Sequence, residues 1–402
     1  SLKEIQNFSS IDFNGNTIID ILNFNNSSGW FYQKFRLYFD YRNFLYKTSI
    51  LNQLKDKYEN LIVFTRDSNF EYFFKEERNI EIKYQKNKEN KKSISKIYLI
   101  FFLCRAFIGI FQLIFPRNSK TAFLEFPEND QLILFPDKTI KKGNYIMAFL
   151  SQKFKKKLIL NDIPPPKPGH NFNKRNWKLL LKFRNNQFTE IIFILGLLKH
   201  RKKINNIVSN QKSNLLQIQK TTNSKNNKVL FNLLLRYMSS MKLSLIRYYS
   251  FKDFFEHQKL NHLIGYNEYS PMGRSIFDAS NSADLKSVAI QHGAIHNLHP
   301  GYIYSDYESK LNIFPSIYLA WGPKWKKMLT TFNHPVEILK NVGQIRADIV
   351  PELNKSEKPL KQYIIYASQP QRDEHLRKKV LKDILKASKS LRHSSLIIRP
   401  HP

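Results

Sequence analysis

One short segment of the sequence holds the residue types that acid–base catalysis requires. Gln291-His292-Gly293 ends one apolar run, and Glu268 follows the apolar run before it. A carboxylate beside an imidazole orients the ring and raises its basicity, as a general base needs. We therefore predict that His292 is the catalytic base and Glu268 its partner, with Gln291 and Gly293 in contact with substrate. The alternative is a histidine with a purely structural role at a strand end.

The local pattern predicts how these residues come together. Residues 262–267 can form a strand, Ser270 suits a helix N-cap, Pro271 suits the first helical position, and residues 286–291 can form a second strand. A strand–helix–strand unit of this kind has a right-handed crossover, so its two strands are parallel. Both strands then end at the carboxyl edge of the sheet, where open α/β folds bind ligands.

Further polar residues flank this predicted site. Arg274, on the connecting helix, either contacts an anionic substrate or is a solvated helix residue. The loop after Gly293 contains His296 and His299, which we predict to line the acceptor side of a cleft. Three histidines so close together could suggest a metal, but the loop has no Asp or Glu and no helical His-x-x-x-His spacing. We therefore predict that the site is metal-independent.

The glycines gather in the same part of the chain. The sequence has only 12 glycines, about 3% against a usual ~7%. Six of them lie between positions 265 and 343, namely Gly265, Gly273, Gly293, Gly301, Gly322 and Gly343. Such clustering predicts tight turns or a close approach of the backbone to a ligand, and we assign Gly322 to substrate binding.

The elements that must position these residues predict an α/β fold with more than one domain. Apolar residues reach 42% of the chain, enough for real hydrophobic cores. We predict a Rossmann-like N-terminal domain over residues 1–350, with a basic helical insertion at about 141–260, then a linker over 351–362 and the start of a second Rossmann-like domain over 363–402. The chain begins at Ser1 without Met and ends at Pro402, so we expect it to be a fragment.

Charge points to a phosphate-rich partner. The 402 residues include 65 Lys and Arg against 32 Asp and Glu, a net charge of +33. A codon bias that favours Lys and Asn explains part of it, but residues 141–260 alone hold 25 Lys and Arg against 4 Asp and Glu. A field of this kind attracts an anionic membrane or a nucleic acid. No RNA-binding aromatic motif, helix-turn-helix or zinc knuckle is visible, which disfavours nucleic acid. The single cysteine, Cys104, excludes a disulfide framework.

Residues 97–115 form one long apolar stretch. Nineteen residues could just span a bilayer. Arg105 lies at the centre, where a charge costs about 2.5–3.5 kcal/mol to insert, and Gln112 adds to this cost. We predict a helix that is buried or lies in a membrane interface, and does not span.

Four motifs, taken in order, resemble one group of enzymes. They are Gln291-His292-Gly293, the aromatic-Gly-Pro turn at 321–323, Val342-Gly343 and the terminal Arg-Pro-His-Pro over 399–402. The set resembles GT-B glycosyltransferases of bacterial surface and capsular polysaccharide synthesis. This group includes CDP-glycerol glycerophosphotransferases, capsule Kdo transferases and sialyltransferases with a His-Pro motif. UDP-N-acetylglucosamine 2-epimerases share the architecture. The resemblance covers residues 262–402 only.

The resemblance implies a GT-B fold and a nucleotide-sugar-dependent glycosyltransferase. It places His292 at the catalytic cleft and implies that His401, Arg399 and Gly343 contact the donor phosphates. The donor is a nucleotide-activated sugar, with no separate cofactor, and the acceptor is a glycan or a lipid-linked molecule. We expect a cytoplasmic protein, peripheral to the inner face of the membrane.

Three other readings stay open: a CDP-polyol phosphotransferase, a UDP-GlcNAc 2-epimerase-like enzyme, and a basic nucleic-acid-binding protein. Because the second domain is only begun, we expect the fragment alone to be inactive.

Overall fold

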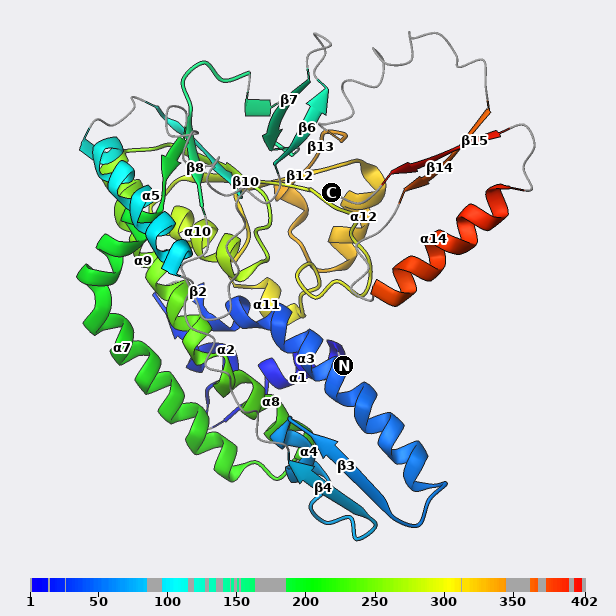
Figure 1. Ribbon diagram of the computed structural model, residues 1–402. Helices are drawn as coiled ribbons and strands as arrows, with labels where there is room; N and C mark the ends of the chain where they lie inside the picture. The colour runs from blue at the N-terminus through cyan, green and yellow to red at the C-terminus, as the bar shows by residue number, and fades with distance from the viewer. Residues whose placement is uncertain are drawn as a thin grey trace. The chain divides into compact units, whose positions relative to one another are not determined.

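The structure is a computed structural model of the chain (Figure 1). It describes residues 2–13, 15–25, 27–84, 96–114, 119–126, 130–134, 140–144, 146–147, 150–151, 153–162, 186–311, 313–344, 362–367, 374–389 and 394–399. The chain divides into two compact units. The large unit is Ser1–Asp130 with Ile146–Ile345, and the small unit is Gln131–Tyr145 with Arg346–Pro402.

A seven-stranded parallel sheet is the centre of the large unit. In spatial order its strands are β13 (Leu339–Asn341), β12 (Ile317–Ala320), β11 (Lys286–Ile290), β10 (His262–Gly265), β5 (Thr121–Glu125), β8 (Leu158–Asn161) and β9 (Asn186–Phe188). The chain adds β8 and β9 on one side of β5 and then returns to place β10 on the other side. This is the strand order of Rossmann-like folds, so the predicted α/β class is confirmed. Such sheets bind ligands where the order reverses, here between β5 and β10.

The predicted strand–helix–strand unit over residues 262–291 is also confirmed. β10 and β11 are adjacent and parallel, and α10 (Pro271–Ser282) connects them. The Ser270 hydroxyl caps α10 by accepting a hydrogen bond from the Gly273 amide at 3.0 Å. A Cβ at Gly273 would lie 2.1 Å from the carbonyl oxygen of Asn267. The close approach of Asn267 to the first turn of α10 therefore requires glycine at this position.

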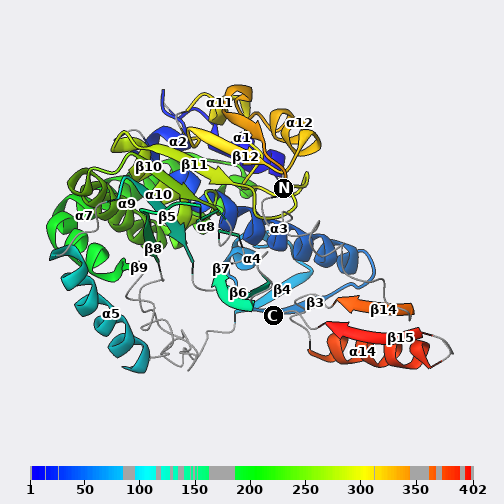
Figure 2. The same ribbon diagram turned by 90° about the horizontal axis from the view of Figure 1, so that it is seen from above.

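Helices cover the sheet. α10 packs on β10 and β11, α12 (Pro323–Thr331) on β12 and β13, and α5 (Lys96–Ile114) on β9. α9 (Met238–Gln258) packs against both α10 and α7 (Glu190–Thr221), and α8 (Lys225–Arg236) lies between α7 and α9 in the chain. Figures 1 and 2 show α7 and α9 side by side, with α5 at the outer edge of this unit.

Residues 2–84 add a mainly helical layer. Its helices are α1 (Leu2–Ser9), α2 (Ile18–Ile21), α3 (Gly29–Lys55) and α4 (Ser68–Phe73), with a short antiparallel pair, β1 (Asn23–Phe24) and β2 (Ser27–Ser28). This layer also contains β3 (Leu61–Thr65), which pairs with β4 (Ile80–Tyr84) and does not join the main sheet.

The α3 helix holds the segment that follows the predicted histidine loop. Trp30 Nε1 donates to Glu308 Oε1 at 2.7 Å, and Lys34 Nζ donates to Glu308 Oε2 at 2.7 Å. Glu308 belongs to α11 (Asp306–Ser309) and is fully buried. A buried carboxylate with two charged or polar donors is well satisfied, so this contact fixes the position of the loop.

Residues 141–260 are more than the helical insertion that the sequence suggested. From Glu190 onwards the segment is helical, as α7, α8 and α9. It also contributes β8 and β9 to the main sheet, so part of this segment is integral to the Rossmann-like core. The sequence did not reveal these strands because both are short and β9 reads Asn-Gln-Phe.

The small unit contains a second strand–helix–strand unit. β14 (Gln362–Ala367) and β15 (Ser394–Arg399) are parallel, with α14 (Glu374–Ser388) between them in the chain. That this unit begins a second Rossmann-like domain stays a prediction. Ile397 and Ile398 are 43% and 39% exposed, as expected for strands that lack a second layer. The expected linker, 351–362, lies almost entirely outside the described residues. β6 (Asp130–Leu134) and β7 (Ile140–Asn144) form a separate two-stranded sheet.

Candidate functional site

Gln291 ties the ends of two neighbouring strands together. It directly follows β11 and is 1% exposed. Its Oε1 accepts a hydrogen bond from the Trp321 amide at 2.9 Å, and its Nε2 donates to the Gly293 carbonyl at 3.0 Å. Trp321 directly follows β12, so one side chain sets the turn after β11 against the turn after β12. These bonds favour a positioning role for Gln291.

His292 lies half-buried between two tyrosines from the end of β10. Its ring stacks on Tyr269 at an interplanar angle of 15°, and the Tyr269 hydroxyl lies 3.4 Å from Nε2. On another side the Tyr266 ring lies 5.6 Å away, centroid to centroid. The Tyr266 hydroxyl in turn accepts a hydrogen bond from the amide of Phe126, directly after β5, at 3.1 Å. The Tyr266 ring therefore lies between the His292 imidazole and the end of β5, where the strand order reverses.

Glu268 lies at the neighbouring strand end and is 4% exposed. The residue before it, Asn267, has a φ of 67°, a left-handed conformation that asparagine tolerates. Burial raises the pKa of Glu268 to about 7, although a hydrogen bond to its own backbone and the charge of Arg274 lower it. Its Oε2 atom makes no hydrogen bond to a described residue. The structure thus places Glu268 and His292 at adjacent strand ends, and direct pairing between them stays a prediction.

The loop after Gly293 brings one of its two histidines to this place. The His299 ring packs edge-on against Tyr269, with centroids 4.7 Å apart, so Tyr269 contacts both His292 and His299. Burial lowers the pKa of His299 to about 4, and the nearby His296 adds to the effect. His299 is therefore neutral at physiological pH. His296 is exposed, and its Nδ1 accepts a hydrogen bond from the Leu298 amide at 3.2 Å.

Gly293 itself faces open space. A Cβ at this position would have no atom within 4 Å. Packing alone therefore does not require glycine here, which is compatible with the predicted approach of a substrate to the backbone.

Arg274 is a buried residue and not the solvated one that was the alternative expectation. It is 3% exposed, and its guanidinium donates to the Ile313 carbonyl and, at 2.9 Å, to the Tyr304 hydroxyl. Asp278, one turn along α10, lies 3.9 Å away. With these internal partners Arg274 joins α10 to the loop before β12, a placement that favours a structural role over contact with substrate.

The remaining predicted residues lie apart from this group or outside the described residues. Gly322 is the N-cap of α12, beside the Trp321 that Gln291 holds. Gly343 follows β13 with a φ of 75°, where a side chain would be strained. Arg399 ends β15 in the small unit, and its side chain lies outside the described residues, as does all of His401. Their contact with donor phosphates stays a prediction.

Sequence reasoning missed the tyrosines that surround the histidine. Tyr266 and Tyr269 flank His292, and Tyr302 packs on Tyr269 with centroids 4.9 Å apart. The only signal in the sequence was the spacing Tyr266-Asn-Glu-Tyr269 at the same strand end as Glu268. Isolated aromatic residues are common in cores, so that spacing alone does not identify a site.

Metal binding has no support in the part of the chain that the structure describes. There, no three His, Cys, Asp or Glu side chains gather as metal ligands. Metal independence stays a prediction.

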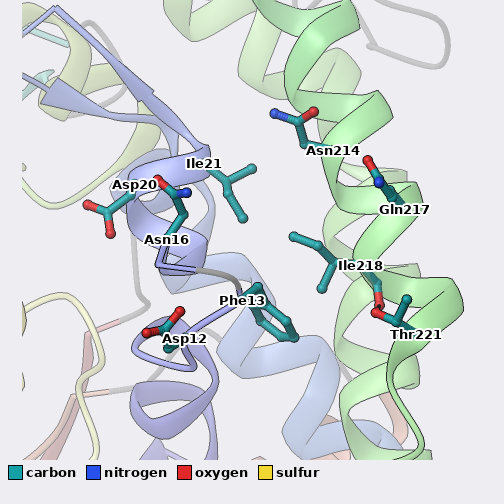
Figure 3. Close-up of a pocket in the computed structure, with 9 residues that line it drawn as sticks. All are labelled: Asp12, Phe13, Asn16, Asp20, Ile21, Asn214, Gln217, Ile218 and Thr221. Carbon is teal, nitrogen blue, oxygen red and sulfur yellow. Dashed lines mark hydrogen bonds between the residues drawn. The ribbon is translucent and has the colours of Figure 1, made fainter.

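A separate pocket opens on the helical side of the large unit. It has a volume of 470 Å³ and lies between residues 12–21 and the second half of α7 (Figure 3). Its lining is Asp12, Phe13, Asn16, Asp20, Ile21, Asn214, Gln217, Ile218 and Thr221. None of the predicted site residues lines this pocket, so it is distinct from the strand ends that carry His292.

Comparison with known proteins finds a distant structural likeness. No protein-family model and no curated protein sequence matches the chain. Similar solved structures include the S. aureus MnaA–UDP co-structure, at 8% identity and a TM-score of 0.38, and UDP-N-acetylglucosamine 2-epimerase from Rickettsia bellii, at 11% and 0.37. Another is UDP-GlcNAc 2-epimerase from Neisseria meningitidis bound to UDP-GlcNAc, at 14% and 0.35.

The alignments cover 70%, 71% and 70% of this chain and 62%, 63% and 65% of those structures. The chain therefore spans less than two thirds of their length. A likeness at this level carries no argument about the activity or substrate of the chain.

Proposed function

We propose that the chain is the acceptor-side part of a metal-independent, nucleotide-sugar-dependent glycosyltransferase of the GT-B type, with His292 as general base. The observation that carries this proposal is the position of His292. It is a half-buried imidazole at the carboxyl edge of a Rossmann-like sheet. The Tyr266 ring lies between it and the end of β5, where the strand order reverses. That edge is where such sheets bind ligands, and half-burial leaves the ring accessible to a substrate hydroxyl.

The proposed reaction uses the chain's own groups in defined roles. The acceptor hydroxyl binds beside His292 Nε2, near the place now taken by the Tyr269 hydroxyl at 3.4 Å. Its oxygen attacks the anomeric carbon, its proton passes to Nε2, and the bond from that carbon to the donor phosphate breaks. The departing nucleoside diphosphate is stabilised by donors at strand ends, for which we propose Gly343, Arg399 and His401.

Glu268 has one of two roles in this proposal. As a carboxylate it orients the His292 imidazole and raises the basicity of the ring. As a neutral acid, which its burial favours, it is a structural group behind the site. For the acceptor we propose a glycan or a lipid-linked molecule, and for the location the cytoplasmic face of the membrane.

The test is His292→Ala, assayed in the longest protein that contains the chain. We expect turnover to fall by roughly 10²–10⁴-fold, the usual contribution of a general base, with little change in donor affinity. His296→Ala is the matched control, because His296 is the exposed histidine of the same loop, and it should keep most of the activity. Unchanged turnover in His292→Ala would remove the base from the proposal.

The same assay distinguishes the reaction classes. A nucleotide sugar incubated without acceptor should remain intact under the transferase proposal. Exchange of the sugar's C2 hydrogen with solvent, followed by NMR, would instead identify an epimerase-like reaction. Release of a nucleoside monophosphate from a CDP-polyol would identify a phosphotransferase.

A further inference from the structure

The α5 helix has two faces of different character. The inner face packs on the large unit through Tyr98, Phe101, Phe102, Arg105, Ala106 and Gly109, all of which are buried. The outer face, called the α5 face below, consists of Ile97, Leu99, Ile100, Leu103, Phe107, Ile110, Phe111 and Ile114, which are between 40% and 61% exposed. Eight large apolar side chains on one helix form a contiguous exposed patch, and such patches mark interaction sites.

Polar anchors on the inner face argue against α5 as a membrane span. By length and composition the helix could cross a bilayer. However, Arg105 is 0% exposed, forms an ion pair with the buried Glu190, and donates to both oxygens of Asn161 at 2.9 Å. Gln112 adds two hydrogen bonds to the backbone of β9. Insertion of α5 across a bilayer would break these contacts and leave the charge of Arg105 without its partner. Binding of the outer face to a membrane surface breaks none of them.

A basic turn follows on the helix against which α5 packs. α5 and α7 run in opposite directions, because Gly109 contacts Ile191, near the start of α7, while Phe101 and Phe102 pack against Phe193 and Ile194. The next turns of α7 expose Leu195, Leu198, Arg201 and Lys202. From Ile191 to Lys252 the sequence contains no Asp or Glu, and Asp253 of α9 pairs with Lys199 and His200.

We propose that the α5 face and this basic turn of α7 together dock on an anionic lipid bilayer, with α5 lying in the plane of the interface. An apolar face set beside Lys and Arg is the pattern of helices that bind anionic membrane surfaces. Charge decides between the two possible occupants. A second copy of the chain would bring the same basic residues together, whereas anionic headgroups neutralise them. The proposal goes beyond the reaction, since none of these residues contacts His292.

Vesicle flotation tests the proposal with the 402-residue chain. The chain should float with vesicles of phosphatidylcholine and phosphatidylglycerol, and less with phosphatidylcholine alone or at high salt. The variant Leu103→Gln/Phe107→Gln/Phe111→Gln should lower partitioning by roughly 100-fold or more, because each side chain loses its apolar burial. Arg201→Glu/Lys202→Glu should lower it by about 10–30-fold on anionic vesicles only.

The matched control is Ile62→Gln/Phe64→Gln on β3. These two side chains are 56% and 64% exposed but lie far from α5 in the chain and on another element. This variant should bind as the unchanged chain does, and all variants should keep the far-UV circular dichroism of the fold.

Four outcomes would overturn the proposal. They are absence of flotation by the unchanged chain, an equal loss in the control variant, a lipid-free dimer that the triple variant abolishes, and retention in the membrane after alkaline carbonate extraction. The third would assign the α5 face to a second copy, and the fourth would make α5 a span. A soluble acceptor assayed in the His292 experiment tests the reaction separately.

Discussion

Glu268 is enclosed by groups that respond to its charge. Its carboxylate raises the pKa of Tyr302 and Tyr318, in each case after the larger effect of burial, and it attracts Arg274. Burial is the first cause of its own raised pKa of about 7, against an ordinary value of 4.5. The protonation state of Glu268 therefore changes near neutrality, inside a packed region.

The sign of the stability effect follows from this shift. Between pH 4.5 and 7 the folded state keeps a proton on Glu268 that the unfolded chain has already released. The contribution of Glu268 to the free energy of unfolding therefore falls as pH rises through this window and is constant above it. His299 and His334, whose pKa values burial lowers to about 4 and about 3, act in the opposite direction below pH 6.5.

A difference measurement isolates Glu268 from those histidines. We expect the free energy of unfolding of Glu268→Gln, relative to that of the unchanged chain, to rise by roughly 2–4 kcal/mol from pH 5 to pH 8. Urea unfolding measures this difference. Glu256→Gln, at an exposed residue, should show no such trend. If Glu268 is instead a carboxylate that supports His292, the Gln variant will gain no stability with pH and will lose activity as His292→Ala does.

At the scale of residues, the sequence predicted where His292 and Glu268 lie in the fold better than it predicted which side chains contact them. His292 and Glu268 could be placed at one sheet edge because each follows an apolar run, and parallel strands end together. The contact between them could not be predicted, because it depends on side-chain packing. Tyr269 occupies the space beside the imidazole, and nothing in its spacing indicated this. For Arg274 the sequence left contact with an anionic substrate and a solvated helix position open, whereas tertiary contacts bury it.

A buried ion pair links the α5 helix to the start of α7. Arg105 and Glu190 are both 0% exposed in their side chains, and burial raises the pKa of Glu190 to about 7 despite the attraction of Arg105. Removal of one partner from a buried pair leaves an uncompensated polar group, which costs about 3–5 kcal/mol. Replacement of both partners by neutral groups costs far less.

We therefore expect Arg105→Met to lower the free energy of unfolding by about 3–5 kcal/mol, and Arg105→Met/Glu190→Gln to recover most of the loss. Lys199→Met is the matched control. It breaks a solvent-exposed pair with Asp253, so its effect should stay below about 1 kcal/mol. Equal losses in the single and double variants would show that packing, and not charge, determines the cost at Arg105.

At the scale of elements, the sequence revealed β10 and β11, which border the predicted site, and did not reveal β5, β8 and β9, on the other side of the reversal of strand order. β10 and β11 could be predicted because a cap and a Pro mark the helix between them. β5 lies inside the sheet, between β10 and β8, and all five of its residues are buried. A strand buried on both faces shows no alternation, so its sequence reads as a short apolar run. β9 is polar, and its backbone is hydrogen-bonded by β8 on one side and by the Gln112 side chain of α5.

The distribution of function over the whole molecule follows from the two units. The large unit holds the seven-stranded sheet, His292, the α5 face and almost all of the buried apolar side chains among the described residues. The small unit supplies no strand to that sheet. The proposed membrane contact therefore belongs to the large unit, while two of the proposed donor residues, Arg399 and His401, belong to the small one.

A chain that ends at Gln344 tests this division. Since the main sheet and its helices are complete without residues 345–402, the shortened chain should unfold cooperatively. Its Tm should lie within about 2 °C of the original, the shift that roughly 1 kcal/mol causes in a large domain. Vesicle flotation should also be unchanged, because α5 and α7 remain.

Removal of residues 1–28 is the contrasting control. It takes away the buried side chains of Ile5, Phe8, Ile18, Ile19 and Leu22, each 0% exposed, although it removes fewer residues than the C-terminal truncation. At about 1.5–3 kcal/mol for each of these five side chains, the loss is as large as the roughly 5–15 kcal/mol that stabilises a typical domain. We expect no cooperative transition in far-UV circular dichroism. If the chain ending at Gln344 also loses its transition, the two units share a core, and the small unit is then part of the structure that positions His292.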